Sequence, residues 1–310
     1  MIPPVRVVVT GAGGFVGSVV SRAFAAAGHP VTGMVRSGAA PPGVRTVVGD
    51  VLDEAAVAAA VAGADVVCHL AARVRVRESR TDPLGYWRTN LDGTRNVLAA
   101  LAPSARLVLA STCTVHAVSE EPISEDSPLA PANPYAASKL AAELLARDVA
   151  LAGGPGVACL RAFNVAGPGD RDTSRVVPAL LASVSDGTSL TSDVRDPPRS
   201  FTVNGDGSAV RDYLHVADLA DAVLAAATVA EPGTWRAFTV GSGRGTSVAD
   251  LVATVERVTG RDVDVRHGPA VDEPPPLVAA PTPARRQLGW EPRRSDPERI
   301  VAEAWHAARG

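Results

Sequence analysis

Short hydrophobic runs alternate with helical stretches through the first half of the chain. Stretches with helical spacing cover 18–27, 54–62, 93–102 and 135–152, and strand-like runs cover 5–10, 31–35, 45–48, 65–70, 106–110 and 157–162. Strands that alternate with helices predict an α/β fold, here a Rossmann-type doubly wound parallel sheet. From about residue 168 onward, Pro and Gly interrupt the pattern, which indicates a smaller, irregular C-terminal part.

The pattern predicts a dinucleotide-binding domain at 1–167 and a mainly substrate-binding part at 168–310. A return to the first domain is expected around 208–230, where Asp218 is predicted to cap a helix at 219–227. A polar, proline-containing stretch at 193–199 is typical of a surface loop.

The composition fits a cytoplasmic globular protein of 310 residues with 46% apolar residues, 20% charged residues and a net charge of -3. The charge is not concentrated in a basic block, so nucleic acid is a poor candidate partner. Arg, Gly, Asp or His interrupts every apolar run, and no secretion signal is recognisable, so no membrane segment is expected. Cys68, Cys113 and Cys159 are widely spaced without a CxxC pattern, so they predict reduced thiols and no metal site.

A glycine-rich turn follows the first predicted strand and opens a helix. In such a turn Gly11 permits the tight bend, Gly14 lets the backbone approach a pyrophosphate, and Gly17 allows close helix packing. The helix N-terminus adds N–H donors and a favourable dipole. The turn therefore predicts a dinucleotide site formed by Gly11, Gly13, Gly14, Phe15, Val16 and Gly17.

The ends of the second and third strands bear on the choice of cofactor. Asp50, followed by Val51, stands where such folds place the adenine; the competing role is a helix cap, for which Asp53 is better placed. After the second strand, Arg36 and Ser37 replace the acidic residue that commonly binds the NAD ribose. They either hold the 2′-phosphate of NADP or are simply solvated, so the cofactor is NAD or NADP.

Tyr135 and Lys139 lie at positions i and i+4 of a predicted helix, one turn apart on the same face. An ammonium beside a phenol stabilises the phenolate, so a lowered Tyr135 pKa and acid/base chemistry are expected. Lys139 is also the only lysine among 30 Lys and Arg residues. A compact point charge is therefore expected to be required at this position.

These residues resemble the extended short-chain dehydrogenase/reductases, and within them the UDP-glucose 4-epimerase-like nucleotide-sugar epimerases and dehydratases. The resemblance covers nearly the whole chain. It is also carried by His69-Leu70-Ala71-Ala72, Glu78-Ser79, Pro83-Leu84-Gly85-Tyr86, Asn90, Gly93-Thr94, Ser111-Thr112-Cys113, Asn133-Pro134-Tyr135, Arg161-Ala162-Phe163-Asn164, Gly167-Pro168, Gly205-Asp206-Gly207, Arg211-Asp212-Tyr213-Leu214-His215-Val216 and Leu288-Gly289-Trp290.

The resemblance implies a role for each matching residue. Thr112 would bind the reacting sugar oxygen, Tyr135 would be the acid/base, and Lys139 its electrostatic partner. Asn164 and Arg211 would hold the diphosphate of a nucleotide-sugar substrate, although a turn role for Asn164 and an ion pair of Arg211 with Asp212 stay open. The cofactor site would also include Leu70, Ala71, Ala72, Asn90, Tyr135 and Lys139. A homodimer through helices near 90–101 and 135–150 is also implied.

Some residues depart from the family pattern. The acidic pair that drives dehydration is replaced by Cys113 and Thr114, so dehydration is not expected, and Cys113 becomes a packed residue of the pocket. His116-Ala117 replaces Tyr-Gly, and a neutral, packed His116 is favoured over a catalytic one. The stretch 270–276 lacks an arginine for a second phosphate contact.

The expected function is a nucleotide-sugar epimerase that oxidises a sugar hydroxyl transiently to a ketone. The alternative is an NADPH-dependent keto-sugar-nucleotide reductase, which Arg36 would favour. A non-catalytic dinucleotide sensor has no evident need for Tyr135 beside Lys139.

Overall fold

The computed structural model describes residues 4–185, 200–269, 275–280 and 283–309. Its centre is a seven-stranded parallel sheet in the order β10-β6-β5-β4-β1-β2-β3. The strands are β1 (Val7–Thr10), β2 (Val31–Val35), β3 (Arg45–Val48), β4 (Val66–His69), β5 (Arg106–Thr112), β6 (Gly156–Ala162) and β10 (Trp235–Val240). The central strands are buried on both faces, as their near-continuous apolar sequences require.

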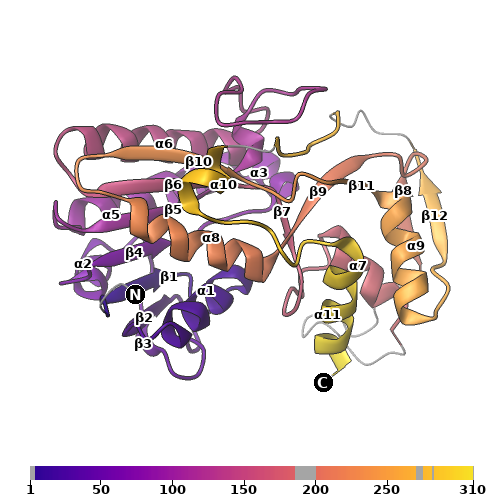
Figure 1. The fold of residues 1–310 in the computed structure, drawn as a ribbon, viewed down its shortest axis with the longest axis horizontal. Helices are drawn as coiled ribbons and strands as arrows, with labels where there is room; N and C mark the ends of the chain where they lie inside the picture. Colours follow the sequence, from indigo (N-terminus) through magenta and orange to yellow (C-terminus); the bar gives the residue numbers. More distant parts are fainter. Residues whose placement is uncertain (1–3, 186–199, 270–274, 281–282, 310) are drawn as a thin grey trace.

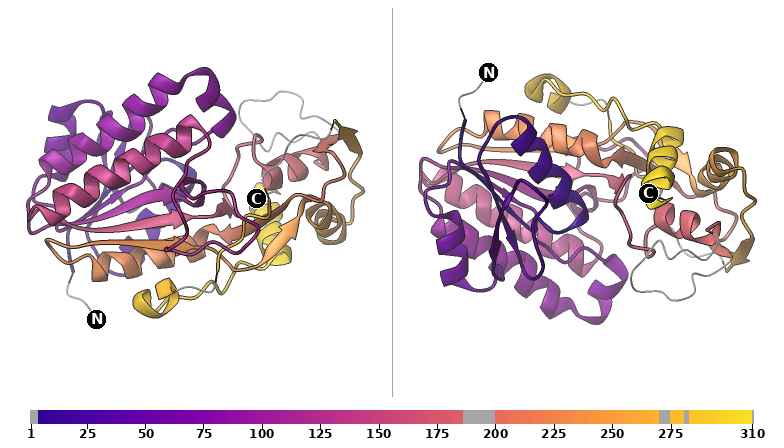
Figure 2. Two further views of the ribbon diagram at one scale, coloured as in Figure 1. Left: turned by 90° about the horizontal axis from the view of Figure 1, so that it is seen from above. Right: turned by 90° about the horizontal axis from the view of Figure 1, so that it is seen from below.

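Helices cover both faces of this sheet (Figures 1 and 2). One face is covered by α1 (Phe15–Ala26) and α8 (Val216–Val229), which pack against each other. The other is covered by α2 (Glu54–Val61), α5 (Gly93–Ala100) and α6 (Pro134–Leu151). This three-layer arrangement is the predicted doubly wound Rossmann-type fold, which is confirmed.

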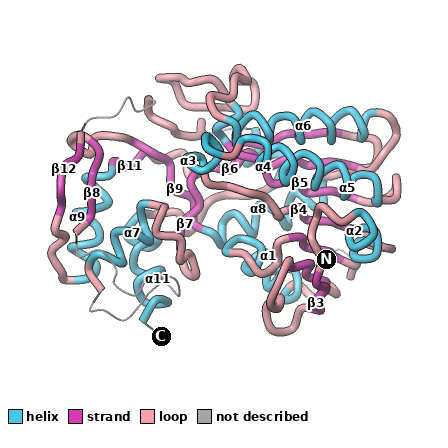
Figure 3. The backbone as a smooth tube through the Cα atoms, turned by 180° about the vertical axis from the view of Figure 1, so that it is seen from behind, coloured by secondary structure: helices cyan, strands magenta, loops and turns pink. Residues whose placement is uncertain are grey.

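A smaller part lies beside the sheet and has its own hydrophobic core (Figure 3). It contains α7 (Val176–Ser183), α9 (Val248–Thr259), α11 (Pro297–Arg309) and two small sheets, β11-β9-β7 and β12-β8. Their strands are β7 (Asn164–Ala166), β8 (Phe201–Asn204), β9 (Val210–His215), β11 (Gly245–Ser247) and β12 (Val265–Gly268). Other α-helices are α3 (Val76–Thr81), α4 (Pro83–Trp87) and α10 (Pro283–Leu288), and short π- and 3-10 helices lie at Arg88–Asp92 and Cys113–Val115.

Each predicted strand and helix of the first half is present, with ends shifted by a few residues. The predicted cap at Asp218 is wrong, because α8 begins at Val216 and His215 is its N-cap. Asp218 is instead fully buried and accepts hydrogen bonds from Arg294 and Ser295. The helix begins before Asp218, so Asp218 lies within its first turn and not at its N-cap.

Two of the predicted segments lie where the structure describes no residues. The loop at 193–199 and residues 270–274 lie outside the described residues. Within the described ranges, no helix is long and apolar enough to cross a membrane, and no cluster of His, Cys, Asp or Glu has the arrangement of a metal site. The boundary at residue 167 stays a prediction, and α8, within the predicted return at 208–230, packs on the main sheet.

Candidate active site

The glycine turn between β1 and α1 is packed too tightly for side chains. Gly11 has a φ of 70°, and a Cβ on Gly17 would lie 2.1 Å from the Gly11 carbonyl oxygen. A Cβ on Gly11 would lie 3.0 Å from the backbone of Ala71. Gly14 is the N-cap of α1 and offers no side-chain cap, so the first-turn N–H groups remain available to an anion.

A buried hydrogen-bond chain fixes the strand ends beside this turn. The Thr10 hydroxyl accepts from the N–H groups of Leu70 and Ala71, both at 3.2 Å, and contacts His69 Nδ1 at 2.8 Å. Since that hydroxyl already accepts two bonds, it donates its proton to Nδ1, and Nε2 donates to Thr94 at 3.2 Å. Burial accordingly lowers the pKa of His69 to about 3. A neutral imidazole therefore ties β1 to β4 without adding charge.

Asn90 links the segment after β4 to α6, which carries Tyr135 and Lys139. Its Oδ1 accepts from the Arg73 N–H at 2.8 Å, and its Nδ2 donates to the Arg73 carbonyl and to Ser138. Ser138 in turn donates to the carbonyl oxygen of Tyr135 at 2.8 Å. Asn90 thus holds the segment that contains Leu70, Ala71 and Ala72 against α6. The predicted cofactor-binding residues are thereby fixed next to the helix that carries the predicted catalytic residues.

The predicted adenosine end is more open. Arg36 and Ser37 follow β2 as exposed residues. The Asp50 carboxylate accepts from the Leu52 N–H at 2.9 Å, whereas Asp53 caps α2, so the cap alternative for Asp50 is wrong. Val51 is buried, and its carbonyl accepts from Asn96. The side chains of Arg36 and Ser37 are therefore accessible to an adenosine ribose.

The three predicted catalytic residues converge at the carboxyl edge of the sheet. Thr112 is the last residue of β5 and is buried, as are Tyr135 and Lys139 of α6. This helix starts at Pro134, and Asn133 caps it by accepting from the Ala136 N–H at 2.9 Å. The Tyr135 ring meets the ring of Tyr86 edge to face, with centroids 6.4 Å apart. The Tyr135 ring therefore packs against an aromatic neighbour from α4.

Burial controls the ionisation of this pair. Burial raises the pKa of Tyr135 to about 12, although its hydrogen bond with Thr112 and the charge of Arg175 act in the opposite direction. The predicted lowering of the Tyr135 pKa by Lys139 is therefore wrong for this structure, because desolvation of the phenolate is the larger effect. Burial also lowers the pKa of Lys139 to about 8, against the opposing effects of Cys159 and Glu143.

A buried ion pair joins α6 to β6. Arg161 of β6 donates to Glu143 of α6 at 2.8 Å, and both side chains are almost fully buried. Ser111 also donates to Glu143. Glu143 is one turn beyond Lys139, so this pair fixes the face of α6 that carries Tyr135 and Lys139.

The predicted diphosphate residues lie where β7 and β9 pair. Asn164 is exposed and donates to the Asp212 carbonyl at 3.4 Å. The Asp212 carboxylate accepts hydrogen bonds from the N–H and hydroxyl of Ser242, from the Gly243 N–H and from the Ala279 N–H. The side chain of Arg211 donates to its neighbouring carbonyl at Val210. Asp212 therefore organises the loops around Arg211.

Two departures from the family pattern have structural roles. Cys113 packs with Ile123, Phe163 and Ala279, and burial raises the pKa of its thiol to about 12. His116 is buried, contacts the Ser127 carbonyl through Nδ1 at 3.0 Å, and has its pKa lowered by burial. Both side chains are packed in the interior, as expected, whereas contact of Cys113 with the substrate stays a prediction.

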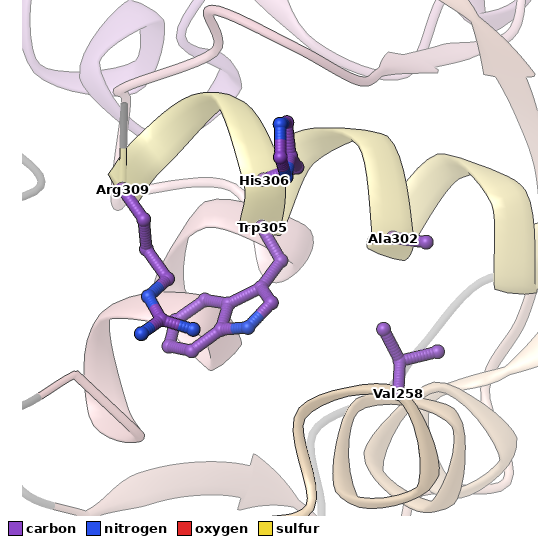
Figure 4. A pocket seen from close by; sticks show the side chains of 5 residues that line it. All are labelled: Val258, Ala302, Trp305, His306 and Arg309. Atoms are coloured by element: carbon purple, nitrogen blue, oxygen red, sulfur yellow. The ribbon is translucent and has the colours of Figure 1, made fainter.

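A hollow between α9 and α11 lies apart from these residues. Val258, Ala302, Trp305, His306 and Arg309 line it (Figure 4). The guanidinium of Arg309 lies 5.3 Å from the centroid of the Trp305 ring. The hollow contains none of the predicted catalytic or cofactor-binding residues.

The fold and the site together define an extended short-chain dehydrogenase/reductase. Tyr135 forms a hydrogen bond with Thr112 at the end of a parallel strand, Lys139 lies one turn farther along the same helix, and the glycine turn opens a helix without a side-chain cap. Residues 7–241 match the model of the NAD dependent epimerase/dehydratase family, and the chain belongs to that family.

Similar proteins agree with this assignment. The chain is 37% identical over 323 residues to a UDP-glucose 4-epimerase of Azospirillum brasilense, covering 96% of this chain and 90% of the relative. It resembles the structure of MoeE5 in complex with UDP-glucose and NAD, with a TM-score of 0.87, 29% identity and 98% of each chain covered. A Brucella ovis UDP-glucose 4-epimerase with NAD shows a TM-score of 0.85, 30% identity and the same coverage.

Proposed function

We propose that this chain is an NAD-dependent nucleotide-sugar epimerase that inverts carbon 4 of a UDP-linked sugar. The observation that carries the proposal is the convergence of Thr112, Tyr135 and Lys139 beside the glycine turn. Similarity to UDP-glucose 4-epimerases supports the substrate class. The similar structures hold NAD, so the NADPH-dependent reductase alternative is not favoured.

The described residues fit a dinucleotide. Side chains are excluded from the turn at Gly11 and Gly17, which leaves its backbone open to a pyrophosphate. The buried Lys139 has no hydrogen-bond partner among the described residues, as expected for a group that donates to a bound ribose. When bound, NAD supplies a reversible two-electron oxidant for the sugar carbon.

The residues of the chain transfer the proton of the sugar hydroxyl and position the sugar. Tyr135 accepts the proton of the sugar hydroxyl and later returns it, while Thr112 holds the same oxygen by a hydrogen bond. The positive charge of Lys139 stabilises the phenolate, whose formation burial otherwise opposes. Asn164 and Arg211 retain the diphosphate while the transient keto-sugar turns over between its two faces.

The function is tested with the purified protein and UDP-glucose. We expect the 4-epimer to accumulate to an equilibrium mixture without net consumption of added nucleotide cofactor, and NAD to be released when the protein is denatured. Chromatography of the sugar nucleotides and absorbance at the reduced-nicotinamide band give both readouts. Stoichiometric NADPH consumption with a keto-sugar nucleotide would identify the reductase instead.

Arg36→Ala tests the adenosine end. If Arg36 and Ser37 donate hydrogen bonds to a 2′-phosphate, the variant should bind NADP(H) about 10- to 100-fold more weakly, which is the usual contribution of hydrogen bonds to a charged group. Its affinity for NAD(H) should be almost unchanged. Fluorescence titration of each cofactor measures both. Equal losses for the two cofactors would assign Arg36 a general role in holding the backbone.

Arg211→Ala separates substrate anchoring from chemistry. The diphosphate is bound in the ground state and in the transition state alike, so KM should rise more than kcat falls. Cofactor affinity should be unchanged because the cofactor pyrophosphate belongs to the Gly11–Gly17 turn. Steady-state kinetics and a cofactor titration check this, and a fall in kcat alone would show that Arg211 is structural.

We further propose a cytoplasmic homodimer formed through helices near 90–101 and 135–150. Leu144 is exposed on α6, and Leu84 and Trp87 are exposed on the adjoining α4, which supports a partner surface there. Three buried free thiols support a reducing compartment. Light scattering should give twice the chain mass, and a monomer at micromolar concentration would contradict the dimer.

A further inference from the structure

Thr114 contacts Thr112 twice, yet the proposed reaction does not use it. It lies in the 3-10 helix at Cys113–Val115, which follows β5 and has Thr112 as its N-cap. Cys113 and Val115 on either side of it are buried, whereas Thr114 is half-buried. Of the three residues in this turn, Thr114 is therefore the one whose side chain stays partly accessible beyond the carboxyl end of β5.

Both contacts of Thr114 are made to the hydroxyl oxygen of Thr112. The Thr114 N–H donates to Thr112 Oγ1 at 3.2 Å, and the hydroxyl oxygens of the two residues are 2.9 Å apart. The Thr112 hydroxyl also forms a hydrogen bond with Tyr135, which acts to lower the pKa of the phenol. The Thr112 hydroxyl thus links Thr114 to the proposed acid/base.

The chemistry of the reaction decides the direction of the hydrogen bond between the two hydroxyls. A threonine hydroxyl has one proton to donate and two lone pairs that accept. Once the sugar hydroxyl is oxidised, its oxygen is a ketone oxygen, which carries no proton and only accepts hydrogen bonds. Thr112 holds that oxygen only by donating its own proton to it, so Thr114 must then be the donor to Thr112. The reverse direction would leave the ketone with Tyr135 as its donor and without Thr112.

We propose that Thr114 is a positioning residue of the epimerase: its N–H and its hydroxyl both donate to Thr112, so that the Thr112 proton is directed to the reacting sugar oxygen. The inference rests on the proposed epimerase function and adds a residue to its site. A hydroxyl that accepts hydrogen bonds is polarised and donates its own proton more strongly. A carboxylate at residue 114 could only accept, so this direction depends on a hydroxyl there.

Thr114→Val tests the proposal, because it keeps the backbone N–H and the branched shape of the side chain and removes only the hydroxyl. With the full-length protein and UDP-glucose, kcat should fall about 3- to 10-fold, the usual contribution of a neutral hydrogen bond. KM and the NAD dissociation constant should change little, since Thr114 acts through Thr112 and not on either ligand. Thr114→Ser restores the hydroxyl and should return kcat to nearly the wild-type value.

Thr239→Val is the matched control, since Thr239 is a buried threonine of β10 whose hydroxyl has no hydrogen-bond partner among the described residues. Its kcat and KM should equal those of wild type. An unchanged or higher kcat in Thr114→Val would overturn the proposal, because Thr112 would then be the donor of the pair. A raised KM with an unchanged kcat would overturn it by assigning Thr114 to substrate binding. A loss of kcat that Thr114→Ser does not restore would show a merely structural role.

The ionisation of Tyr135 gives a readout that does not depend on turnover. Donation by Thr112 stabilises the phenolate, so Thr114→Val should raise the pH at which Tyr135 ionises by about 0.5 to 1 unit. Thr114→Ser and Thr239→Val should leave this pH unchanged. The tyrosinate absorbance of the NAD-loaded protein, minus that of the same variant carrying Tyr135→Phe, measures it.

The ionisable groups around Tyr135 are the same in all of these variants. They are Tyr86 on α4, Cys113 after β5, Arg175 at the N-cap of α7 and Lys139 one turn along α6. A change in the ionisation of Tyr135 is therefore attributed to its hydrogen bond with Thr112. If UDP-glucose is not epimerised, the proposed function fails, and this titration then decides the inference separately: an unshifted midpoint in Thr114→Val overturns it.

Discussion

Tyr135→Phe should lower kcat at least about 100-fold, in line with the usual contribution of a general acid/base. The substitution removes the phenolic proton and retains the ring that packs edge to face against Tyr86. The NAD dissociation constant should change little, because the glycine turn and Lys139 are untouched. Single-turnover reduction of bound NAD by the nucleotide sugar, combined with an NAD titration, measures the two effects separately.

Tyr86→Phe is the control for this substitution. The Tyr86 hydroxyl donates to the Arg75 carbonyl at 2.7 Å and accepts from the Arg75 N–H at 3.0 Å, so it has a structural role. This variant should lose stability while keeping most of its turnover. If Tyr135→Phe turns over as fast as wild type, another group must move the proton, and the assignment of Tyr135 is wrong.

The sheet and its cofactor turn were predictable because they depend on local sequence. Buried parallel strands need continuous apolar runs, and a turn in which a Cβ at Gly17 would lie 2.1 Å from a carbonyl oxygen admits only glycine there. Asp53 was recognised as a cap for the same reason, since capping depends on neighbours within one helical turn. Asp218 was misassigned because its partners, Arg294 and Ser295, are more than 70 residues away.

The catalytic pair was predictable in identity but not in electrostatics. Spacing places Tyr135 and Lys139 on one helical face, but it does not report how deeply that face is buried. Burial reverses the expected direction of the Tyr135 pKa shift. Tyr135 is desolvated because residues from β5, α4 and α6 pack together. A short stretch of sequence gives no information on such packing.

Arg175 was missed because its surroundings come from three separate segments. The signal present in the sequence was a group of charged residues, Asp170 to Arg175, directly after Gly167-Pro168. Taken alone, such a group is typical of a solvated loop. Only the contact of the Arg175 guanidinium with the Phe15 ring, and the ion pair of Arg75 with Asp172, show that this segment lies against the dinucleotide-binding side.

Lys139→Met should remove most of the activity and should stabilise the ligand-free protein. Turnover should fall about 10²- to 10³-fold, the usual effect of removing one group that stabilises developing negative charge. Stability should rise at neutral pH because the buried ammonium has no hydrogen-bond partner among the described residues, and its desolvation opposes folding. Glu143 keeps its partner Arg161, so the substitution leaves no carboxylate unpaired there.

The stability difference between Lys139→Met and wild type should depend on pH. Because burial lowers the pKa of Lys139 from 10.5 to about 8, the unfolded chain binds more protons between these values, and wild-type stability gains from this residue as pH rises through that range. The advantage of Lys139→Met should therefore be largest below pH 8 and shrink toward pH 10.5. Urea unfolding across this range measures it, with Arg22→Met, an exposed position on α1, as the control. A variant less stable than wild type at every pH would mean that Lys139 stabilises the fold through a partner.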